Sequence, residues 1–307
     1  MRIIAVLNSQ SGTLRTTDMD AFIADAVAVF KMHGHDMVCV QTDGAGIERA
    51  LQQAAENKDF DVLLAGGGDG TISAAAALAW EYNKILAVLP VGTMNLFARS
   101  LNIPQNINTA VEALAQSAIH KVDIGLCNRQ VFVHQVAIGL HPMLVLQRET
   151  YDYGSRAGKI WANIRSMGLV IKNVPRIKTE ALIDGREIKG VFSAIAVSNN
   201  PYGDSALPVA PDIQTGRLGF YLAQPLPARG MVKLLFDVLR GKWRNNLAIA
   251  EEHAKSVQLQ FFHQKRHKYM LLDGELLPLP MKLDIQIHAG ILRVMAPLTA
   301  IANKATF

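Results

Sequence analysis

The sequence predicts a two-domain protein, in which an α/β domain built on a parallel sheet precedes an antiparallel β domain, either a sandwich or a barrel. Over the first 125 residues strand-like and helix-like patterns alternate, and the strand-like runs are too apolar to leave one face in water. Such strands are typical of a parallel sheet covered by helices on both sides. After about Val122, short runs separated by turns take over, as in antiparallel sheets.

The elements of the first half follow from the position of apolar residues and of helix-end signals. Thr17 is predicted to cap the first helix and Gly34 to end it. Two further helices are predicted at 47–57 and 71–82 from their apolar faces. The predicted strands are 2–7, 37–41, 61–65 and 85–89.

In the second half the pairs Asp184–Gly185 and Asp273–Gly274 are typical of tight hairpin turns. The predicted strands are 131–136, 179–184, 192–198, 218–222, 256–262, 269–272 and 283–288, and the predicted helical insertions are 157–173 and 228–241. We expect the segment 291–301 to return to the first domain. The predicted domains are therefore 1–124, completed by 291–307, and 125–290.

Composition narrows the class of protein. No apolar window approaches the length of a membrane span, and the first ten residues look like a strand rather than a secretory leader. Cys39 and Cys127 lie in apolar runs without metal-like spacing, which favours buried, reduced thiols and a cytoplasmic location. The net charge of +5 suits an anionic partner. No fold or aromatic-basic pattern supports nucleic-acid binding.

The stretch DVLLAGGGDGTISAAAALAW at 61–80 joins a strand, a glycine turn and a helix. The first N–H groups of a helix lack intrahelical partners, and glycines allow an anion to approach the backbone closely. Gly66, Gly67, Gly68 and Gly70 are therefore predicted to cradle phosphate, and Thr71 to cap the helix or bond a phosphate oxygen. The spacing fits neither a P-loop nor the dinucleotide-binding fingerprint.

Asp69 is the one acid within this glycine stretch. A carboxylate beside phosphates repels them unless a divalent cation lies between, so Asp69 is predicted to bind the Mg²⁺ of a nucleotide. The alternative is that Asp69 only stabilises the turn and the start of the helix.

Small polar or glycine residues follow all four predicted strands of the first domain. In parallel sheets ligands gather beyond the carboxyl ends of the strands, so this coincidence predicts a nucleotide site. Besides the glycine stretch, its members are Asn8, Ser9, Gln10, Ser11, Gly12, Thr42, Gly92, Thr93 and Asn95.

Three motifs occur in order along the chain: GGDGT at 67–71, GTMNLFAR at 92–99 and LLDGE at 271–275. Together they resemble the diacylglycerol kinase catalytic family, which includes bacterial soluble lipid kinases and sphingosine kinases. GGDGT alone is shared with NAD kinases, but GTMNLFAR makes the resemblance highly specific. The likeness extends over nearly the whole chain.

The resemblance implies an α/β domain of the NAD kinase and diacylglycerol kinase type, a C-terminal β-sandwich domain, and an active site in the cleft between them. ATP, with Mg²⁺, would phosphorylate a lipid hydroxyl. Glu275 falls on the position of the proton acceptor, with Asp273 as a co-ligand or as the base itself. The positions that match ATP-binding positions of the family are Asn8 to Gly12, Thr42, Gly67, Gly68, Asp69, Gly70, Thr71, Ile72, Ser73 and Thr93.

Two departures from the family pattern concern the second half. Thr215 stands where family members often carry an acid of a second, structural metal site, and Arg217 lies next to it. Asp212 is the alternative carboxylate, and we expect this metal site to be weak or absent. The residues 200–206 replace a glycine-rich stretch and alter the substrate-side pocket.

A lipid kinase has to meet its substrate at a bilayer. The segments from Ser155 and from Gly230 are basic and amphipathic and contain Trp161 and Trp243, which suits the inner membrane surface, although such apolar stripes more often face a core. We therefore expect a cytoplasmic lipid kinase that acts on diacylglycerol or a related lipid. The alternatives are an NAD kinase-like enzyme and a nucleotide- or lipid-binding module without catalysis.

Overall fold

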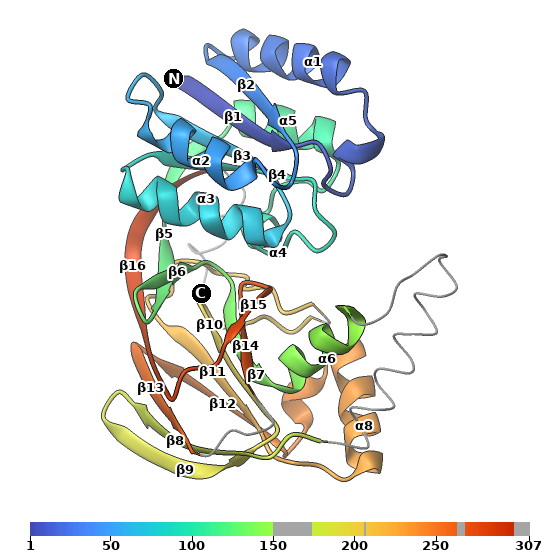
Figure 1. Cartoon of the computed structure of the whole chain (residues 1–307), viewed down its shortest axis with the longest axis vertical. Coiled ribbons are helices and arrows are strands. Elements are labelled where there is room, and N and C mark those ends of the chain that lie inside the picture. Colours follow the sequence, from blue (N-terminus) through green and yellow to red (C-terminus); the bar gives the residue numbers. More distant parts are fainter. Residues whose placement is uncertain (150–173, 206, 263–267, 298–307) are drawn as a thin grey trace, which may run out of the picture.

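The computed structural model describes residues 1–149, 174–205, 207–262 and 268–297, which form two lobes joined by long strands (Figure 1). The helix predicted at 157–173, with the basic segment from Ser155, lies outside the described residues. The segments 263–267 and 298–307 lie outside them as well.

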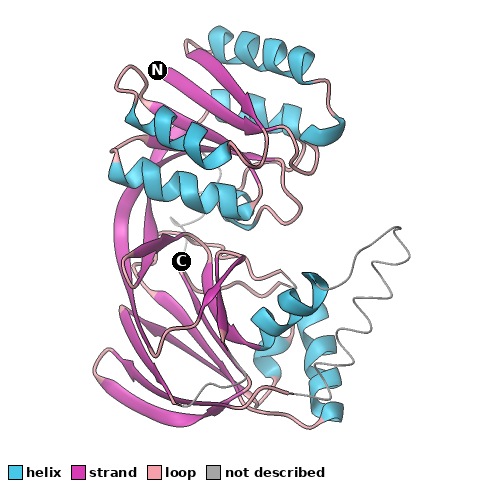
Figure 2. Cartoon of the chain, viewed as in Figure 1, coloured by secondary structure: helices cyan, strands magenta, loops and turns pink. Residues whose placement is uncertain are grey.

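The first lobe is an α/β layer structure. Its parallel strands follow the order β2-β1-β3-β4, and Figure 2 shows helices on both faces of this sheet. β3 and β4 are buried along their whole length, as their apolar sequences predict. The elements are β1 (Arg2–Asn8), α1 (Met19–Met32), β2 (Asp36–Thr42), α2 (Ile47–Glu56), β3 (Val62–Gly67), α3 (Asp69–Glu81), β4 (Ile85–Pro90), α4 (Leu96–Ser100) and α5 (Ile107–Ala115).

The second lobe is antiparallel, which together with the first lobe confirms the predicted fold class. Its six-stranded sheet has the order β12-β11-β10-β7-β14-β15. Strands β16, β13, β8 and β9, which belong to the larger ten-stranded sheet, pack against it around a shared apolar core. The elements are β6 (Gln130–Phe132), β7 (Gln135–Gly139), α6 (Leu140–Glu149), β8 (Ile177–Ile183), β9 (Arg186–Phe192), β10 (Ala194–Ser198), β11 (Leu218–Ala223), α8 (Ala228–Leu239), β12 (Ile249–Ala254), β13 (Ser256–Phe261), β14 (Tyr269–Leu272) and β15 (Glu275–Pro278).

Two long strands connect the lobes. β5 (Ala118–Cys127) pairs antiparallel with β16 (Lys282–Ala296), whose far end also pairs with β4, at Val294 and Leu86. The sheet of the first lobe therefore continues into the second. A register shift between His288 and Leu292 divides β16 where the two lobes meet.

The amphipathic helix predicted after Gly230 is α8. Met231 and Leu234 on this helix are buried, as the core-facing alternative expects, whereas Val232 and Phe236 are 40% and 54% exposed. No helix within the described ranges is long and apolar enough to cross a bilayer.

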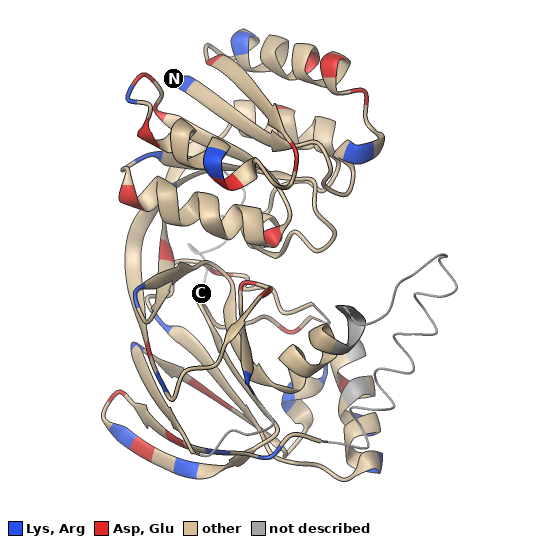
Figure 3. Cartoon of the chain, in the orientation of Figure 1, with Lys and Arg blue, Asp and Glu red and all other residues tan. Residues whose placement is uncertain are grey.

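The hairpin of β8 and β9 lies at one edge of the larger sheet, and Figure 3 shows Lys, Arg, Asp and Glu alternating along it. Lys189 on β9 pairs with both Glu180 and Glu187. Charges at a sheet edge prevent pairing with other chains, so this edge is protected from aggregation.

Some element ends differ from the predictions. The first helix is capped by Asp18, whose carboxylate accepts the N–H of Ala21, whereas Thr17 ends a short 3-10 turn. Strand β3 continues through Gly67, and α3 begins at Asp69. The glycine stretch is therefore divided between a strand and a helix. Gly66 pairs with β1 and β4, and Gly67 pairs with β4, so the backbone of both residues takes part in the sheet.

Candidate active site

A cavity of about 1030 Å³ lies between the two lobes. The first lobe lines it with α2 and with the face of α3 that starts at Asp69, Gly70 and Thr71. The second lobe lines it with β6 and with the turn between β14 and β15, including Glu275. The structure thus brings together two motifs that lie about 200 residues apart in the sequence.

The N-terminus of α3 is open. Gly68 is its N-cap residue, and no side chain caps the first turn. The first hydrogen bond within the helix runs from the N–H of Ile72 to the carbonyl of Gly68. The N–H groups that precede it carry the partial positive charge of the helix end and have no partner within the helix.

Two glycines near this end of the helix allow close packing within the protein. A Cβ atom at Gly67 would lie 2.5 Å from Thr71, and one at Gly92 would lie 2.9 Å from the Cα atom of Gly68. These two glycines are therefore required by the close packing of the two loops.

Gly68 and Gly70 are different, because a Cβ atom at either position would meet no described atom within 4 Å. Neither residue has a positive φ. Neither packing nor backbone conformation therefore requires glycine at these two positions. A ligand that approaches the backbone closely would require it at both. This open cradle fits phosphate groups.

Asp69 lines the cavity, and its carboxylate also supports the neighbouring loop. Its two oxygens accept the N–H groups of Asn95, at 3.2 Å, and Leu96, at 2.7 Å. It thereby holds the start of α4 against the start of α3. A carboxylate oxygen has a second lone pair, so this role and metal binding are compatible.

Asp273 is a structural tie between the lobes. It is 3% exposed, and its carboxylate accepts four hydrogen bonds, from the Ser73 hydroxyl at 2.7 Å and from the N–H groups of Val133, His134 and Gln135. Burial raises the pKa of Asp273, and these four donors oppose that effect. Its oxygens are saturated, which argues against Asp273 as a base.

Glu275 differs from Asp273 in each of these respects. It is exposed at the start of β15, and its side chain lines the cavity. Within the described part of the chain no hydrogen bond or ion pair engages its carboxylate. Of the two acids, Glu275 is the one that is free to accept a proton.

The other predicted nucleotide residues lie at the carboxyl edge of the sheet. Asn8 and Thr42 are register partners at the ends of β1 and β2, and the carbonyl of Thr42 accepts both the N–H and the hydroxyl of Ser9. The Asn8 side chain accepts the N–H of Gln10, which closes a turn next to Ser11 and Gly12. These residues share the sheet edge with the cradle but do not line the cavity.

Three predicted residues have side chains that are engaged elsewhere. Ile72 lies in the core at 4% exposure, and its N–H donates to the carbonyl of Gly68, so neither its side chain nor its N–H is available to a ligand. Ser73 donates to Asp273. Asn95 adopts a left-handed conformation with φ of 52°, and its amide donates to Gln105, whereas Thr93 is exposed.

Sequence reasoning missed Gln135 and Tyr202. The Tyr202 hydroxyl donates to the Gln135 side chain at 2.5 Å, and Gln135 donates its N–H to Asp273. Their partners lie 67 and 138 residues away. No local pattern in the sequence signals contacts of this kind.

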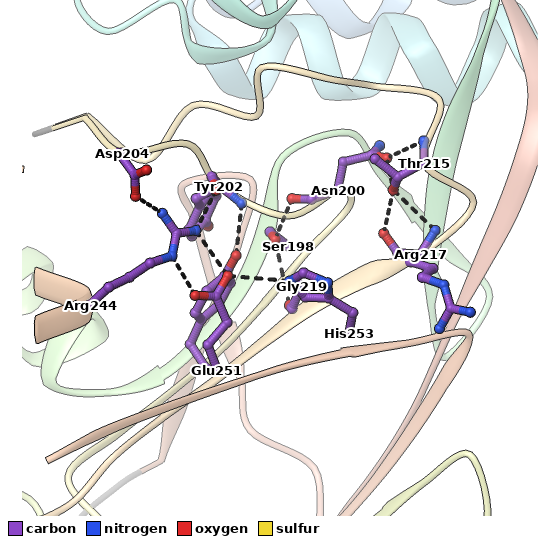
Figure 4. A network of polar contacts seen from close by, with 11 residues as sticks. Ser198, Asn200, Tyr202, Asp204, Thr215, Arg217, Gly219, Arg244, Glu251 and His253 are labelled. Carbon is purple, nitrogen blue, oxygen red and sulfur yellow. Dashed lines mark hydrogen bonds and ion pairs between the residues drawn. The ribbon is translucent and has the colours of Figure 1, made fainter. Parts of the chain in front are cut away.

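The site expected for a second, structural metal does not fit a cation. A Mg²⁺ ion needs oxygen atoms that face it. Figure 4 shows the Asn200 side-chain oxygen turned toward Thr215, from which it accepts both the N–H at 3.1 Å and the hydroxyl at 2.6 Å. The Thr215 hydroxyl is in turn close to the backbone of Arg217.

The nearby carboxylates are also bonded to the protein backbone. Asp123, 1% exposed, accepts the N–H groups of Gly216 at 2.7 Å and Gly290 at 2.8 Å. Asp212 accepts the N–H of Gln214. No cluster of three or more His, Cys, Asp or Glu residues suited to a metal occurs among the described residues. Hydrogen bonds hold this loop in the place where the family resemblance implied a metal.

We therefore expect thermal stability to be independent of Mg²⁺ when no nucleotide is present. The melting temperature, measured by differential scanning calorimetry in EDTA and in excess Mg²⁺, should be the same in both. Thr215→Val should lower it in both conditions, because Asn200 then loses a partner, typically about 1 kcal/mol. A rise with Mg²⁺ in the wild type that Asp123→Asn removes would show a metal here.

The chain is similar in sequence to proteins of known family. Residues 2–127 match the family model described as diacylglycerol kinase catalytic domain. The diacylglycerol kinase of Staphylococcus haemolyticus (strain JCSC1435) is 23% identical over 260 residues, which cover 82% of this chain and 76% of the relative. That of Staphylococcus aureus (strain JH9) is 24% identical, covering 82% and 80%.

Solved structures share the fold. The crystal structure of a diacylglycerol kinase from Bacillus anthracis str. Sterne has a TM-score of 0.71 and 18% identity, and 98% of each chain is covered. A second structure from this organism has a TM-score of 0.76 and 21% identity, covering 98% of this chain and 96% of the other. Residues 2–127 thus form a diacylglycerol kinase catalytic domain, and the chain is a lipid kinase.

Proposed function

We propose that this protein transfers the γ-phosphate of ATP to a hydroxyl of diacylglycerol or a related lipid. One observation carries the proposal: Gly70 of the open glycine cradle, with its neighbours Asp69 and Thr71, lines the same cavity as Glu275, whose carboxylate has no partner among the described residues. Phosphoryl transfer requires bound phosphates and, close to them, a group that receives the proton of the alcohol.

Each residue has a role in this reaction. The backbone at Gly68 and Gly70 holds the phosphates of ATP, and Glu275 accepts the proton of the lipid hydroxyl. The bond between the γ-phosphorus and its bridging oxygen breaks, a bond to the lipid oxygen forms, and ADP leaves. Bound Mg²⁺ would offset the negative charge of the phosphates.

The donor set around the cavity supports a nucleotide-bound Mg²⁺. Acids predominate among the lining residues, namely Glu48, Asp69, Glu81, Asp273 and Glu275, against the single basic residue Arg129. Mg²⁺ is commonly held by one or two carboxylates together with substrate phosphates. Asp69, at the edge of the cradle, is the carboxylate that we assign to it.

We place the enzyme in the cytoplasm, at the inner surface of the membrane where its substrate lies. The exposed Val232 and Phe236 on α8, with the exposed Lys233 and Arg240, support contact with an anionic interface. The alternative of a module without catalysis is motivated by Thr215 and the altered loop at 200–206, and the hydrogen bond between Thr215 and Asn200 gives this loop support from the protein itself.

The test is transfer of radioactive γ-phosphate from ATP to lipids in mixed micelles, with diacylglycerol, monoacylglycerol and sphingosine as acceptors. We expect a phosphorylated product with at least one of these lipids, and none when Mg²⁺ is removed. Incubation with NAD and ATP tests the NAD kinase alternative. NADP formation, or tight ATP binding without turnover of any acceptor, would contradict the proposal.

A further inference from the structure

The place of Glu275 depends on the turn that precedes it. Asp273 and Gly274 connect β14 to β15 with φ values of 47° and 89°, and Glu275 follows directly as the register partner of Leu272. Two consecutive positive φ values are typical of a tight two-residue hairpin turn. Movement of this turn would therefore move Glu275.

The Asp273 carboxylate fixes the turn on two sides. One side is α3, whose Ser73 hydroxyl donates to Oδ2. The other is the segment at the start of β7, where the N–H of Val133 donates to Oδ2 and that of Gln135 to Oδ1, at 2.7 and 2.8 Å. The distance between Glu275 and the phosphate cradle thus depends on where this segment lies.

Gln135 connects the segment to a more distant loop. Its backbone N–H donates to Asp273, while its side-chain Oε1 accepts the hydroxyl of Tyr202 at 2.5 Å. Gln135 is 6% exposed, so no solvent replaces this donor easily. Burial raises the pKa of Tyr202 well above its ordinary value, so the hydroxyl stays protonated and donates.

Tyr202 itself is held on several sides. Its N–H donates to the Tyr221 hydroxyl at 2.7 Å, and the two rings stack at a centroid distance of 4.9 Å. Its carbonyl accepts from Arg244 at 2.5 Å, and Arg244 also pairs with Glu251 and Asp204, as Figure 4 shows. The Tyr202 hydroxyl therefore has a fixed position relative to the β-sandwich.

We propose that Tyr202 and Gln135 are positioning residues for phosphotransfer, which hold Asp273 and, through the turn, place Glu275 opposite the start of α3. The inference rests on the proposed function, because that reaction gives Glu275 its role. Neither residue belongs to the three motifs of the sequence. The altered loop at 200–206 contributes Tyr202 to this arrangement.

The first test is Tyr202→Phe, which removes the hydroxyl and keeps the ring. We expect kcat for the lipid acceptor to fall by about tenfold to a hundredfold, because small displacements of a reacting group are costly. The KM for ATP should not change, since the cradle at Gly68 and Gly70 is untouched. Tyr202→Ala should be no more active than Tyr202→Phe.

Ser193→Ala is the matched control. The Ser193 hydroxyl, in a residue that is 1% exposed, bonds the carbonyls of Ala223 and Gln224 in the same lobe and has no link to Asp273. Both variants lose a buried hydroxyl, so both should melt at lower temperature, but only Tyr202→Phe should lose kcat. A purely structural role of Tyr202 predicts equal kcat values in assays well below both melting temperatures, and that result would overturn the inference.

A double-mutant cycle with Ser73→Ala provides a second readout. If Tyr202 and Ser73 act through the same Asp273 carboxylate, the double variant should lose less kcat than the product of the two single losses. Fully multiplicative losses would refute a shared route. Either negative result would leave wild-type lipid phosphorylation intact, so this failure is distinguishable from failure of the proposed function.

Discussion

Replacing Glu275 by Gln lowers kcat for lipid phosphorylation by about 10²- to 10⁴-fold, the usual contribution of a general base. The amide keeps the size of the side chain but cannot accept the alcohol proton. Because Glu275 is exposed and its carboxylate makes no hydrogen bond or ion pair with the described residues, the melting temperature should stay unchanged. Steady-state kinetics and calorimetry measure the two quantities on the same sample.

Glu81→Gln is the control for this prediction. Glu81 is exposed and lines the same cavity from the C-terminal end of α3, so the substitution makes the same change of charge away from the cradle. We expect it to retain kcat within a few-fold. If both variants lost activity equally, the effect would come from the charge of the cavity and not from a base. If Glu275→Gln kept full activity, the assigned role would be wrong.

The second large effect is expected for Gly70→Ala, with opposite signs for stability and ATP binding. Gly70 lies in the first turn of α3 without a positive φ, so Ala should stabilise the fold by about 0.4–1 kcal/mol. Its Cβ atom would meet no described protein atom, but it would occupy the space that we assign to phosphate. We expect the affinity for ATP to fall at least tenfold, measured by isothermal titration calorimetry with Mg²⁺ present.

Substitutions at two other glycines distinguish an effect on stability from an effect on ATP binding. Gly67→Ala should lower the melting temperature, because its Cβ atom would lie 2.5 Å from Thr71. Gly230→Ala, in the first turn of α8 and away from the cavity, should leave ATP affinity unchanged. Unchanged ATP binding by Gly70→Ala would mean that the cradle does not hold the nucleotide.

The amino-acid pattern was sufficient to predict the architecture and the position of the glycine loop in the first lobe. Apolar runs such as 85–89 gave buried parallel strands, since a strand covered on both faces has no wet side, and the GGDGT residues marked the start of α3. These signals are local: neighbours along the chain produce both the pattern and the structure. For the same reason the Asp273–Gly274 pair predicts a tight turn, and both residues have the positive φ values of such a turn.

Local patterns could not assign the roles of the two acids at that turn. In sequence Asp273 and Glu275 are equivalent carboxylates two residues apart, yet one is saturated by four donors and the other is unengaged. Three of those donors come from 133–135 and one from Ser73 in the other lobe, so the difference arises only when the lobes are assembled. The sequence by itself determined the fold class and the position of the glycine loop that we propose for phosphate binding, because these depend on residues adjacent in the chain. The tertiary structure decided which of the two carboxylates is engaged by the protein and which partners Thr215 has, because burial and hydrogen bonding between distant segments depend on how the two lobes pack.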